Sequence, residues 1–119
     1  GKEYAFINAG RKKTKYSALE AANLMEDMGA GEIILQSIDR DGMMEGFDIP
    51  MLKNISDNIS LPTIGLGGGG KMDHLLDVFN KSNISGVACG SYFVFQDSQR
   101  GVLINYPSKK DLKLFQGIR

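Results

Sequence analysis

The 119-residue sequence predicts an α/β fold in which parallel strands alternate with outer helices. Three short apolar runs each end in a polar or glycine-rich loop: SIDRDG (Ser37–Gly42), GLGGGG (Gly65–Gly70) and GVACGS (Gly86–Ser91). The first two loops lead into stretches with helical periodicity, so strand, loop and helix repeat roughly every 30 residues. Such a repeat indicates right-handed βαβ crossovers and a parallel sheet, in which the chemistry gathers at the carboxyl ends of the strands.

The N-terminal part is predicted to hold a strand and a helix. Alternating β-forming residues predict the strand over Glu3–Asn8, and a basic loop over Arg11–Lys15 follows it. Ser17 is expected to cap the helix, because Glu20 three residues later completes a capping box. Gly29 would end this helix, and its apolar face would comprise Leu19, Ala22, Leu24 and Met28.

The remaining elements alternate between strands and helices. The run EIILQSI (Glu32–Ile38) is largely apolar, as expected of a strand buried on both faces of a parallel sheet. Pro50 suits the first turn of a helix, and Ser108 can cap a last helix after Pro107. The expected strands are Glu32–Ile38, Leu61–Leu66 and Ser85–Gly90, and the expected helices are Ile49–Asn58, Met72–Lys81 and Lys109–Phe115.

Two folds fit this alternation of strands and helices. One is a small doubly wound domain, and the other is a piece of a (βα)8 barrel, which usually needs about 250 residues. Length favours the doubly wound domain, whereas the loop residues favour the barrel. The chain begins at Gly1 rather than Met and opens directly in a strand-like run, which favours a fragment.

Charge and composition narrow the classes of partner. The chain carries 14 Lys and Arg against 14 Asp and Glu, so it has no overall field that would attract nucleic acid or an anionic membrane. No apolar run approaches the ~20 residues that span a bilayer, and the N-terminus lacks a signal-peptide core. The apolar neighbours of Cys89, the single cysteine, indicate a buried strand thiol in a reducing compartment, so a soluble cytoplasmic protein is expected. One Cys and one His cannot supply four zinc ligands, and neither a metal nor a cofactor is expected.

The glycine loop matches G-x-G-x-x-G at Gly65, Gly67 and Gly70, directly after a strand and before a helix. A dinucleotide site would add an acidic residue about 20 positions later, and the sequence has none there, so that type of site is rejected. Consecutive glycines let backbone N–H groups approach an anion, and the helix N-terminus favours phosphate. The small residues Gly90 and Ser91 would complete a phosphate site across two loops. The alternative is a flexible turn without a ligand.

Three stretches together resemble the C-terminal half of the cyclase subunit of imidazole glycerol phosphate synthase: GAGEIILQSIDRDG (Gly29–Gly42), PTIGLGGGGKMDH (Pro62–His74) and GVACGSYF (Gly86–Phe93). The resemblance extends from about Tyr4 to the last helix. It implies the C-terminal half of a (βα)8 TIM barrel, with residues 1–119 forming one segment from the strand-five insertion to helix eight. On this match the three later strands are barrel strands six, seven and eight.

The resemblance also implies an enzyme of histidine biosynthesis. In that family, ammonia from a glutaminase partner enters the bottom of the barrel and attacks a bisphosphorylated ribonucleotide at the top. Cyclisation and lyase cleavage then yield imidazole glycerol phosphate. The two principal acid/base aspartates of the family lie on strands one and five, upstream of Gly1, so this segment is expected to be inactive by itself.

The same match carries site residues onto this chain. It implies a catalytic role for Asp41, a substrate contact for Gly42 and an ammonia gate at Glu32. It implies phosphate binding by Gly67, Gly68, Gly90 and Ser91. Each carboxylate has a simpler alternative, since Asp41 could cap its own turn and Glu32 could mark where a buried strand meets solvent. Asp39 is left open between a structural and a substrate-facing role.

Several positions depart from the histidine-pathway pattern. Ala9, Gln36 and Leu66 stand where that pattern usually has a Ser or Thr hydroxyl, so three polar contacts to substrate are lost or replaced. A buried partner left unsatisfied in this way typically costs about 1–3 kcal/mol. The tail Gln99–Leu112 resembles a paralogous group found with surface-polysaccharide genes, whose members deliver ammonia for amidine formation on a sugar. The substrate is therefore open between a ribonucleotide and a sugar of lipopolysaccharide biosynthesis.

A contrasting hypothesis is a non-catalytic phosphate-binding or assembly module, because the segment lacks the two principal carboxylates. An aspartate at the end of each of two upstream strands would favour the enzyme. Half a barrel also leaves sheet edges unpaired, so self-association through Glu32–Ser37 and Ser85–Gly90 is expected. His74 is expected to face solvent or to cap a helix, and Arg11–Lys15 either covers a phosphate or is solvated.

Overall fold

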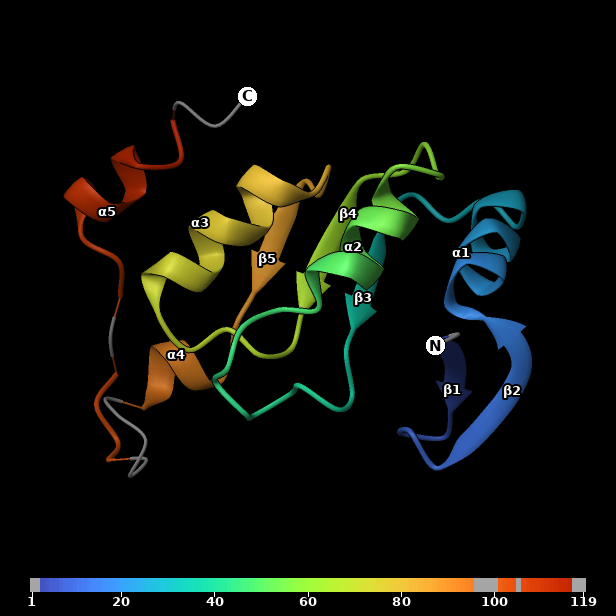
Figure 1. The fold of residues 1–119 in the computed structure, drawn as a ribbon, viewed down its shortest axis with the longest axis horizontal. Coiled ribbons are helices and arrows are strands. Elements are labelled where there is room, and N and C mark those ends of the chain that lie inside the picture. Colours follow the sequence, from blue (N-terminus) through green and yellow to red (C-terminus); the bar gives the residue numbers. More distant parts are fainter. Residues whose placement is uncertain (1–2, 96–100, 105, 117–119) are drawn as a thin grey trace.

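The chain forms two sheets, an antiparallel hairpin and a three-stranded parallel sheet (Figure 1). The computed structural model describes residues 3–95, 101–104 and 106–116. The hairpin pairs β1 (Tyr4–Ile7) with β2 (Lys12–Ser17), and the parallel sheet has the order β3-β4-β5. Its strands are β3 (Ile33–Gln36), β4 (Thr63–Leu66) and β5 (Gly86–Ala88), and the helices are α1 (Ala18–Asp27), α2 (Ile49–Ser56), α3 (Met72–Lys81), α4 (Ser91–Val94) and α5 (Lys109–Lys113).

The parallel sheet confirms the predicted α/β class. Gln36 lies beside Leu66, and Leu66 lies beside Ala88, so the three strands end at one edge of the sheet. Each predicted strand is shorter than expected, whereas the helices begin where their patterns placed them. Two elements were not predicted: strand β2 and the short helix α4.

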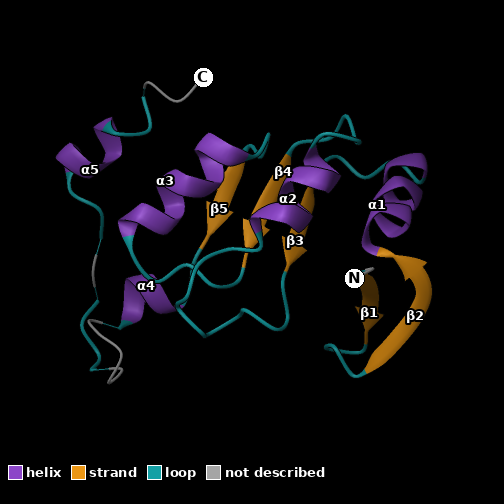
Figure 2. Cartoon of the chain, in the orientation of Figure 1, coloured by secondary structure: helices purple, strands orange, loops and turns teal. Residues whose placement is uncertain are grey.

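Helices α2 and α3 lie along one face of the parallel sheet (Figure 2). Leu52 and Ile55 of α2 are each 1% exposed, and Val78 of α3 is fully buried. Gly65 in β4 lets α2 come close, because a Cβ at this position would lie 2.8 Å from Cδ1 of Leu52. Truncating a buried Leu to Ala typically costs about 2–5 kcal/mol, so this interface is a main source of stability.

The opposite face of β3 has no helix over it in the described part of the chain. Burial alternates along the strand, since Ile33 and Leu35 pack against the core while Ile34 is 59% exposed. Ile38, just beyond the strand, is also exposed. The expectation of a strand buried on both faces is therefore wrong for this chain, because helices cover one face only.

The predicted basic loop is wrong as well, because residues 12–15 lie within strand β2. Thr14 helps to hold the hairpin together by donating its hydroxyl to the carbonyl oxygen of Ala5 at 2.8 Å. The lysines around Thr14 are exposed. A run of lysines lacks the apolar alternation by which a half-buried strand is usually predicted, so this strand gave little signal.

A tight turn with left-handed backbone connects β1 to β2. Ala9 and Gly10 have φ values of +55° and +79°, and the Arg11 N–H donates to the carbonyl oxygen of Asn8 at 3.3 Å. Positive φ at both central residues is typical of a type I′ turn, whose twist matches that of a hairpin. Glycine tolerates this conformation, whereas Ala9 is strained in it.

Replacing Ala9 by Asn should stabilise the protein, because Asn adopts the left-handed region more readily than most residues that carry a Cβ. The left-handed conformation costs an L-residue roughly 1–2 kcal/mol, so we expect Ala9→Asn to raise the free energy of unfolding by about 0.5–1 kcal/mol. Urea denaturation would measure this difference. Ala9→Val is the matched control and should lower stability, because β-branched residues are disfavoured at positive φ. Equal midpoints for all three proteins would show that the turn is not strained.

The predicted helix caps are confirmed in two places. The hydroxyl of Ser17 accepts from the Glu20 N–H at 3.2 Å, and the Glu20 carboxylate accepts from the Ser17 N–H at 2.7 Å. Ser108 and Asp111 form the same capping box at the start of α5. In the tail predicted to resemble the paralogous group, residues 99, 100 and 105 lie outside the described residues.

Helix α1 only partly follows its predicted apolar face. Ala22 is buried and Leu19 is half-buried, but Leu24 is exposed and Met28 is 73% exposed, so the prediction is wrong at the last two positions. Gly29 ends the helix with a φ of +90°, as expected. None of the helices in the described residues combines the length and the apolar character needed to cross a membrane.

Candidate functional site

The loops that follow β3, β4 and β5 leave the same edge of the parallel sheet (Figure 1). Two of them are joined directly, because the Gly46 N–H donates to the carbonyl oxygen of Gly68 at 2.8 Å. Glu32 lies at the opposite edge, before β3, and is exposed. The edge that carries the loops holds the other predicted site residues: Asp41, Gly42, Gly67, Gly68, Gly90 and Ser91.

The glycine loop, residues 67–70, is packed tightly against its neighbours. Gly67 and Gly68 both have φ values of +100°, a conformation that favours glycine. A Cβ on Gly67 would lie 2.7 Å from the carbonyl oxygen of Ser37, and one on Gly68 would overlap the carbonyl oxygen of Gly46. These contacts argue against a freely flexible turn. Within the described residues, the N–H groups of Gly68 and Gly69 donate to no protein acceptor, which leaves two donors for a ligand.

Asp41 is exposed in the first half of the loop after β3, and two hydrogen bonds tie it back to the end of the strand. Its carboxylate Oδ2 accepts from Nε2 of Gln36 at 2.8 Å, and its backbone N–H donates to the carbonyl oxygen of Ser37 at 3.0 Å. Gly42 follows with a φ of +77°. The Asp41 side chain accepts from no backbone N–H among the described residues, and its catalytic role stays a prediction.

The loop after β5 contacts the glycine loop through Cys89. A Cβ on Gly69 would lie 2.5 Å from the Cys89 sulfur, so these two loops are in contact. Burial raises the pKa of the Cys89 thiol to about 11, which keeps it protonated near neutral pH. Gly90 is the N-cap residue of α4, which begins at Ser91, and a Cβ on Gly90 would meet no atom within 4 Å. The fold therefore leaves open space at Gly90, unlike at Gly67 and Gly68.

One lysine of β2, Lys13, borders a hollow beside the end of β3. The Nζ of Lys13 lies 3.4 Å from the ring centroid of Tyr4, which is a cation–π contact. Lys13 lines this hollow of about 540 Å³ together with Gln36 and the exposed Asp39.

Across the described residues, no group of three or more His, Cys, Asp or Glu side chains could hold a metal ion.

Comparison with known proteins identifies the family. A family model described as "Histidine biosynthesis protein" matches residues 1–99. The chain belongs to this family. Histidine biosynthesis proteins of this family fold as TIM barrels, and the parallel sheet of this chain is consistent with part of such a barrel.

Two relatives illustrate the family. The chain is 44% identical over 112 residues to "Putative imidazole glycerol phosphate synthase subunit hisF2" of Pseudomonas aeruginosa, covering 94% of the chain and 45% of that relative. It is 42% identical over 97 residues to "Imidazole glycerol phosphate synthase subunit HisF" of Pelodictyon phaeoclathratiforme, covering 81% of the chain and 39% of that relative. The chain thus spans less than half the length of these curated relatives.

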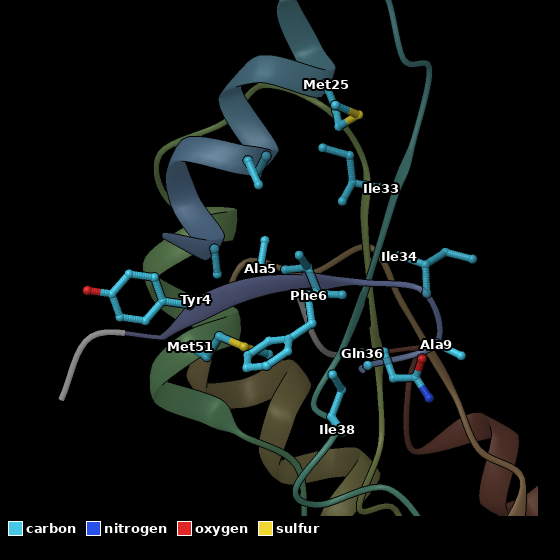
Figure 3. A pocket seen from close by; sticks show the side chains of 15 residues that line it. Tyr4, Ala5, Phe6, Ala9, Met25, Ile33, Ile34, Gln36, Ile38 and Met51 are labelled. Atoms are coloured by element: carbon cyan, nitrogen blue, oxygen red, sulfur yellow. The ribbon is translucent and has the colours of Figure 1, made fainter. Parts of the chain in front are cut away.

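A groove of about 520 Å³ separates the hairpin and α1 from the outer edge of β3 (Figure 3). Ala9 and Gln36 line this groove, and Leu66 lies beside Gln36 in the sheet register. Two of the three positions predicted to depart from the histidine-pathway pattern thus line one groove, and the third is adjacent to one of them in the sheet. Most of the remaining lining is apolar and includes Tyr4, Phe6, Met25, Ile34 and Met51.

Two contacts near these loops had no signal in the sequence. Gln36 and Asp41 are bonded through their side chains, although nothing in the spacing indicated that pairing. The Gly70 N–H donates to Nδ1 of His74 at 3.3 Å, a bond to the residue before the N-cap of α3, so the capping role of this histidine stays a prediction. For Glu32, no ion pair is formed with any residue that the structure describes, and its gating role stays a prediction.

Proposed function

We propose that this chain is the C-terminal half of the (βα)8 barrel of an ammonia-using cyclase of the imidazole glycerol phosphate synthase type. The joined loops at the sheet edge carry the proposal. The glycine loop presents the N–H groups of Gly68 and Gly69 without a protein acceptor, and α3 begins directly after it. Phosphate suits this place, because backbone donors and the helix dipole both favour negative charge.

A half-barrel accounts for the open surfaces of the parallel sheet. β3 and β5 are its outer strands, and Ile34 on the open face is 59% exposed. A further parallel strand beside β3 would fill the groove, and the other half of a barrel would cover the open face. Residues 1–119 would then be one segment of a larger domain, which agrees with their coverage of less than half of the relatives.

In the proposed enzyme, this segment holds substrate and contributes one carboxylate. A substrate phosphate lies on Gly67, Gly68, Gly90 and Ser91, with Gly42 nearby. Asp41 transfers a proton at the reacting end, where the amide of Gln36 orients its carboxylate at 2.8 Å. Glu32, at the opposite edge, lies where ammonia from a glutaminase partner would enter. The free thiol of Cys89 supports a location in the reducing cytoplasm.

A sugar is the second candidate substrate. Ala9 and Leu66 offer no hydroxyl, and the amide of Gln36 is bonded to Asp41 rather than left open for a ligand. These three positions therefore make different contacts from a Ser or Thr set. The relative of Pseudomonas aeruginosa named "Putative imidazole glycerol phosphate synthase subunit hisF2" matches over 94% of the chain. The second candidate reaction is therefore amidine formation on a sugar of surface polysaccharide, with ammonia as the nitrogen source.

The experiment is an ammonia-dependent assay of the full-length protein with each substrate in turn. Conversion of the bisphosphorylated ribonucleotide would support the histidine-pathway cyclase, and conversion of the sugar would support the paralogous function. The 119-residue chain alone should convert neither, because the family's principal aspartates lie upstream. Phosphate binding by the full-length protein without turnover of either substrate would instead favour a non-catalytic phosphate-binding module.

By itself, the 119-residue chain should associate with itself. The outer strands β3 and β5 and the exposed Ile34 provide unpaired edges and apolar surface for a second copy. Light scattering at micromolar concentration should show dimers or larger species. Ile34→Lys should shift the protein toward monomers, because it places a charge on the open face. A stable monomer of the unmodified chain would contradict the half-barrel and favour a small doubly wound domain.

A further inference from the structure

His74 is the third residue of α3, and its ring bonds back to the glycine loop. Nδ1 accepts from the Gly70 N–H at 3.3 Å. The N-cap residue of this helix, Lys71, makes no side-chain capping bond, so the imidazole is the side chain that ties the start of α3 to the loop. This bond holds the end of the glycine loop at a defined distance from the helix.

The same ring also lies against the neighbouring loop. A Cβ on Gly46 would lie 3.8 Å from both Cγ and Cδ2 of His74, so the backbone at Gly46 passes close to the ring. Gly46 in turn donates its N–H to Gly68, and its carbonyl oxygen accepts from Nη1 of Arg40 at 3.3 Å. His74 therefore touches both sides of the junction between the glycine loop and the segment after β3.

We infer that His74 is a positioning residue for phosphate binding, which keeps the Gly68 and Gly69 N–H groups aimed at the anion. The inference rests on the proposed function, because it takes the glycine loop as the phosphate site. The imidazole acts through Gly70 and Gly46 and needs no contact with the substrate. It accepts the Gly70 bond only when Nδ1 carries no proton, so the working form is the neutral ring with its proton on Nε2.

The surroundings of His74 favour that neutral form. Burial lowers the pKa of His74 and the charge of Lys71 lowers it further, while Asp73 and Asp77 act in the opposite direction. Glu45, from the segment after β3, and His74 line one hollow between that segment and α3. Protonation in acid would remove the acceptor and release the Gly70 N–H. The glycine loop should therefore lose its fixed shape as the pH falls through the lowered pKa of His74.

The first test follows the Gly70 amide and the His74 ring by NMR in the full-length protein. As the pH falls below the ordinary imidazole pKa of about 6.5, the Gly70 amide shift should titrate with the same midpoint as the His74 ring carbons. A helix cap unrelated to protonation would leave the Gly70 amide unchanged. Independent midpoints for the two groups would overturn the inference, whether or not the protein binds phosphate.

The second test measures sulfate affinity by calorimetry, because sulfate keeps its double charge over this range. His74→Asn can still accept from Gly70 through Oδ1 and should bind within about twofold of the parent, whereas His74→Leu should bind about fivefold more weakly. Asp77→Asn, a charge change on the same helix, is the control and should bind as the parent does. Equal affinities of the Leu and Asn variants would overturn the inference. Absence of sulfate binding by the parent would refute the proposed phosphate site, and the Gly70 titration would still decide the role of His74.

Discussion

Replacing Gly68 by Asp should abolish phosphate binding by the full-length protein. The new carboxylate would stand next to the proposed anion, and two unit charges about 4 Å apart near a protein surface repel by roughly 4 kcal/mol, which exceeds a hundredfold in affinity. The variant should also lose stability, because Gly68 has a φ of +100° and a Cβ there overlaps the carbonyl oxygen of Gly46. Calorimetric titration with inorganic phosphate and urea denaturation would measure the two effects.

Ser91→Asp separates the charge effect from the loss of stability. Ser91 begins α4, where the backbone is helical, so Asp should fit there without strain and still repel phosphate. Ser85→Asp is the matched control. Ser85 is exposed and directly precedes β5, so it lies at the end of the strand away from the proposed phosphate site. We expect weak binding for Ser91→Asp and parental binding for Ser85→Asp. Unaltered phosphate affinity in a folded Ser91→Asp protein would show that Ser91 does not line the phosphate site.

If the proposed function holds, Asp41→Asn should lower the turnover of the full-length protein by about a hundredfold or more, the usual loss when a general acid or base is removed. Asn has nearly the same shape and can still accept from Nε2 of Gln36, so the loop should keep its structure. Turnover with saturating ammonia measures kcat. Phosphate affinity should stay at the parental value, because the substitution leaves the proposed phosphate site unchanged. A loss confined to kcat would indicate a chemical role.

Asp39→Asn is the comparison for this prediction. Asp39 lies two residues earlier in the same loop and is exposed, so both variants remove one charge from nearly the same place. We expect Asp39→Asn to retain most of its turnover. If Asp39→Asn loses activity and Asp41→Asn does not, the assigned roles are wrong. If both retain activity, neither carboxylate takes part in proton transfer.

The features predicted correctly from the sequence are those with local causes. The capping box at Ser17 and the cap at Ser108 both form as predicted, and each depends on residues three positions apart. The three parallel strands follow from short apolar runs separated by helical stretches, a pattern that allows few topologies. Gly29 ends α1 because the chain turns left-handed there. In each case the signal and the structure lie within the same few residues.

The features that were missed depend on partners distant in the sequence or on other parts of the fold. The strand character of β2 comes from pairing with β1, and its lysines conceal it. The bond between Gln36 and Asp41 depends on how the loop after β3 turns back, which no local pattern indicates. Ile34 is apolar and yet exposed, because its burial would need a surface that the described residues do not provide. Burial on the second face of a sheet is a property of the complete fold.

The proposed phosphate site at Gly67, Gly68, Gly90 and Ser91 is tested most directly by a crystal structure of the full-length protein soaked with phosphate. The account predicts a phosphate within hydrogen-bond distance of the Gly68 and Gly69 N–H groups, with Gly90 and Ser91 on its other side. The glycine loop should keep the positive φ values that it has here, since the site is already formed. Phosphate bound only elsewhere, or a glycine loop whose N–H groups turn away to bond protein oxygens, would contradict the account.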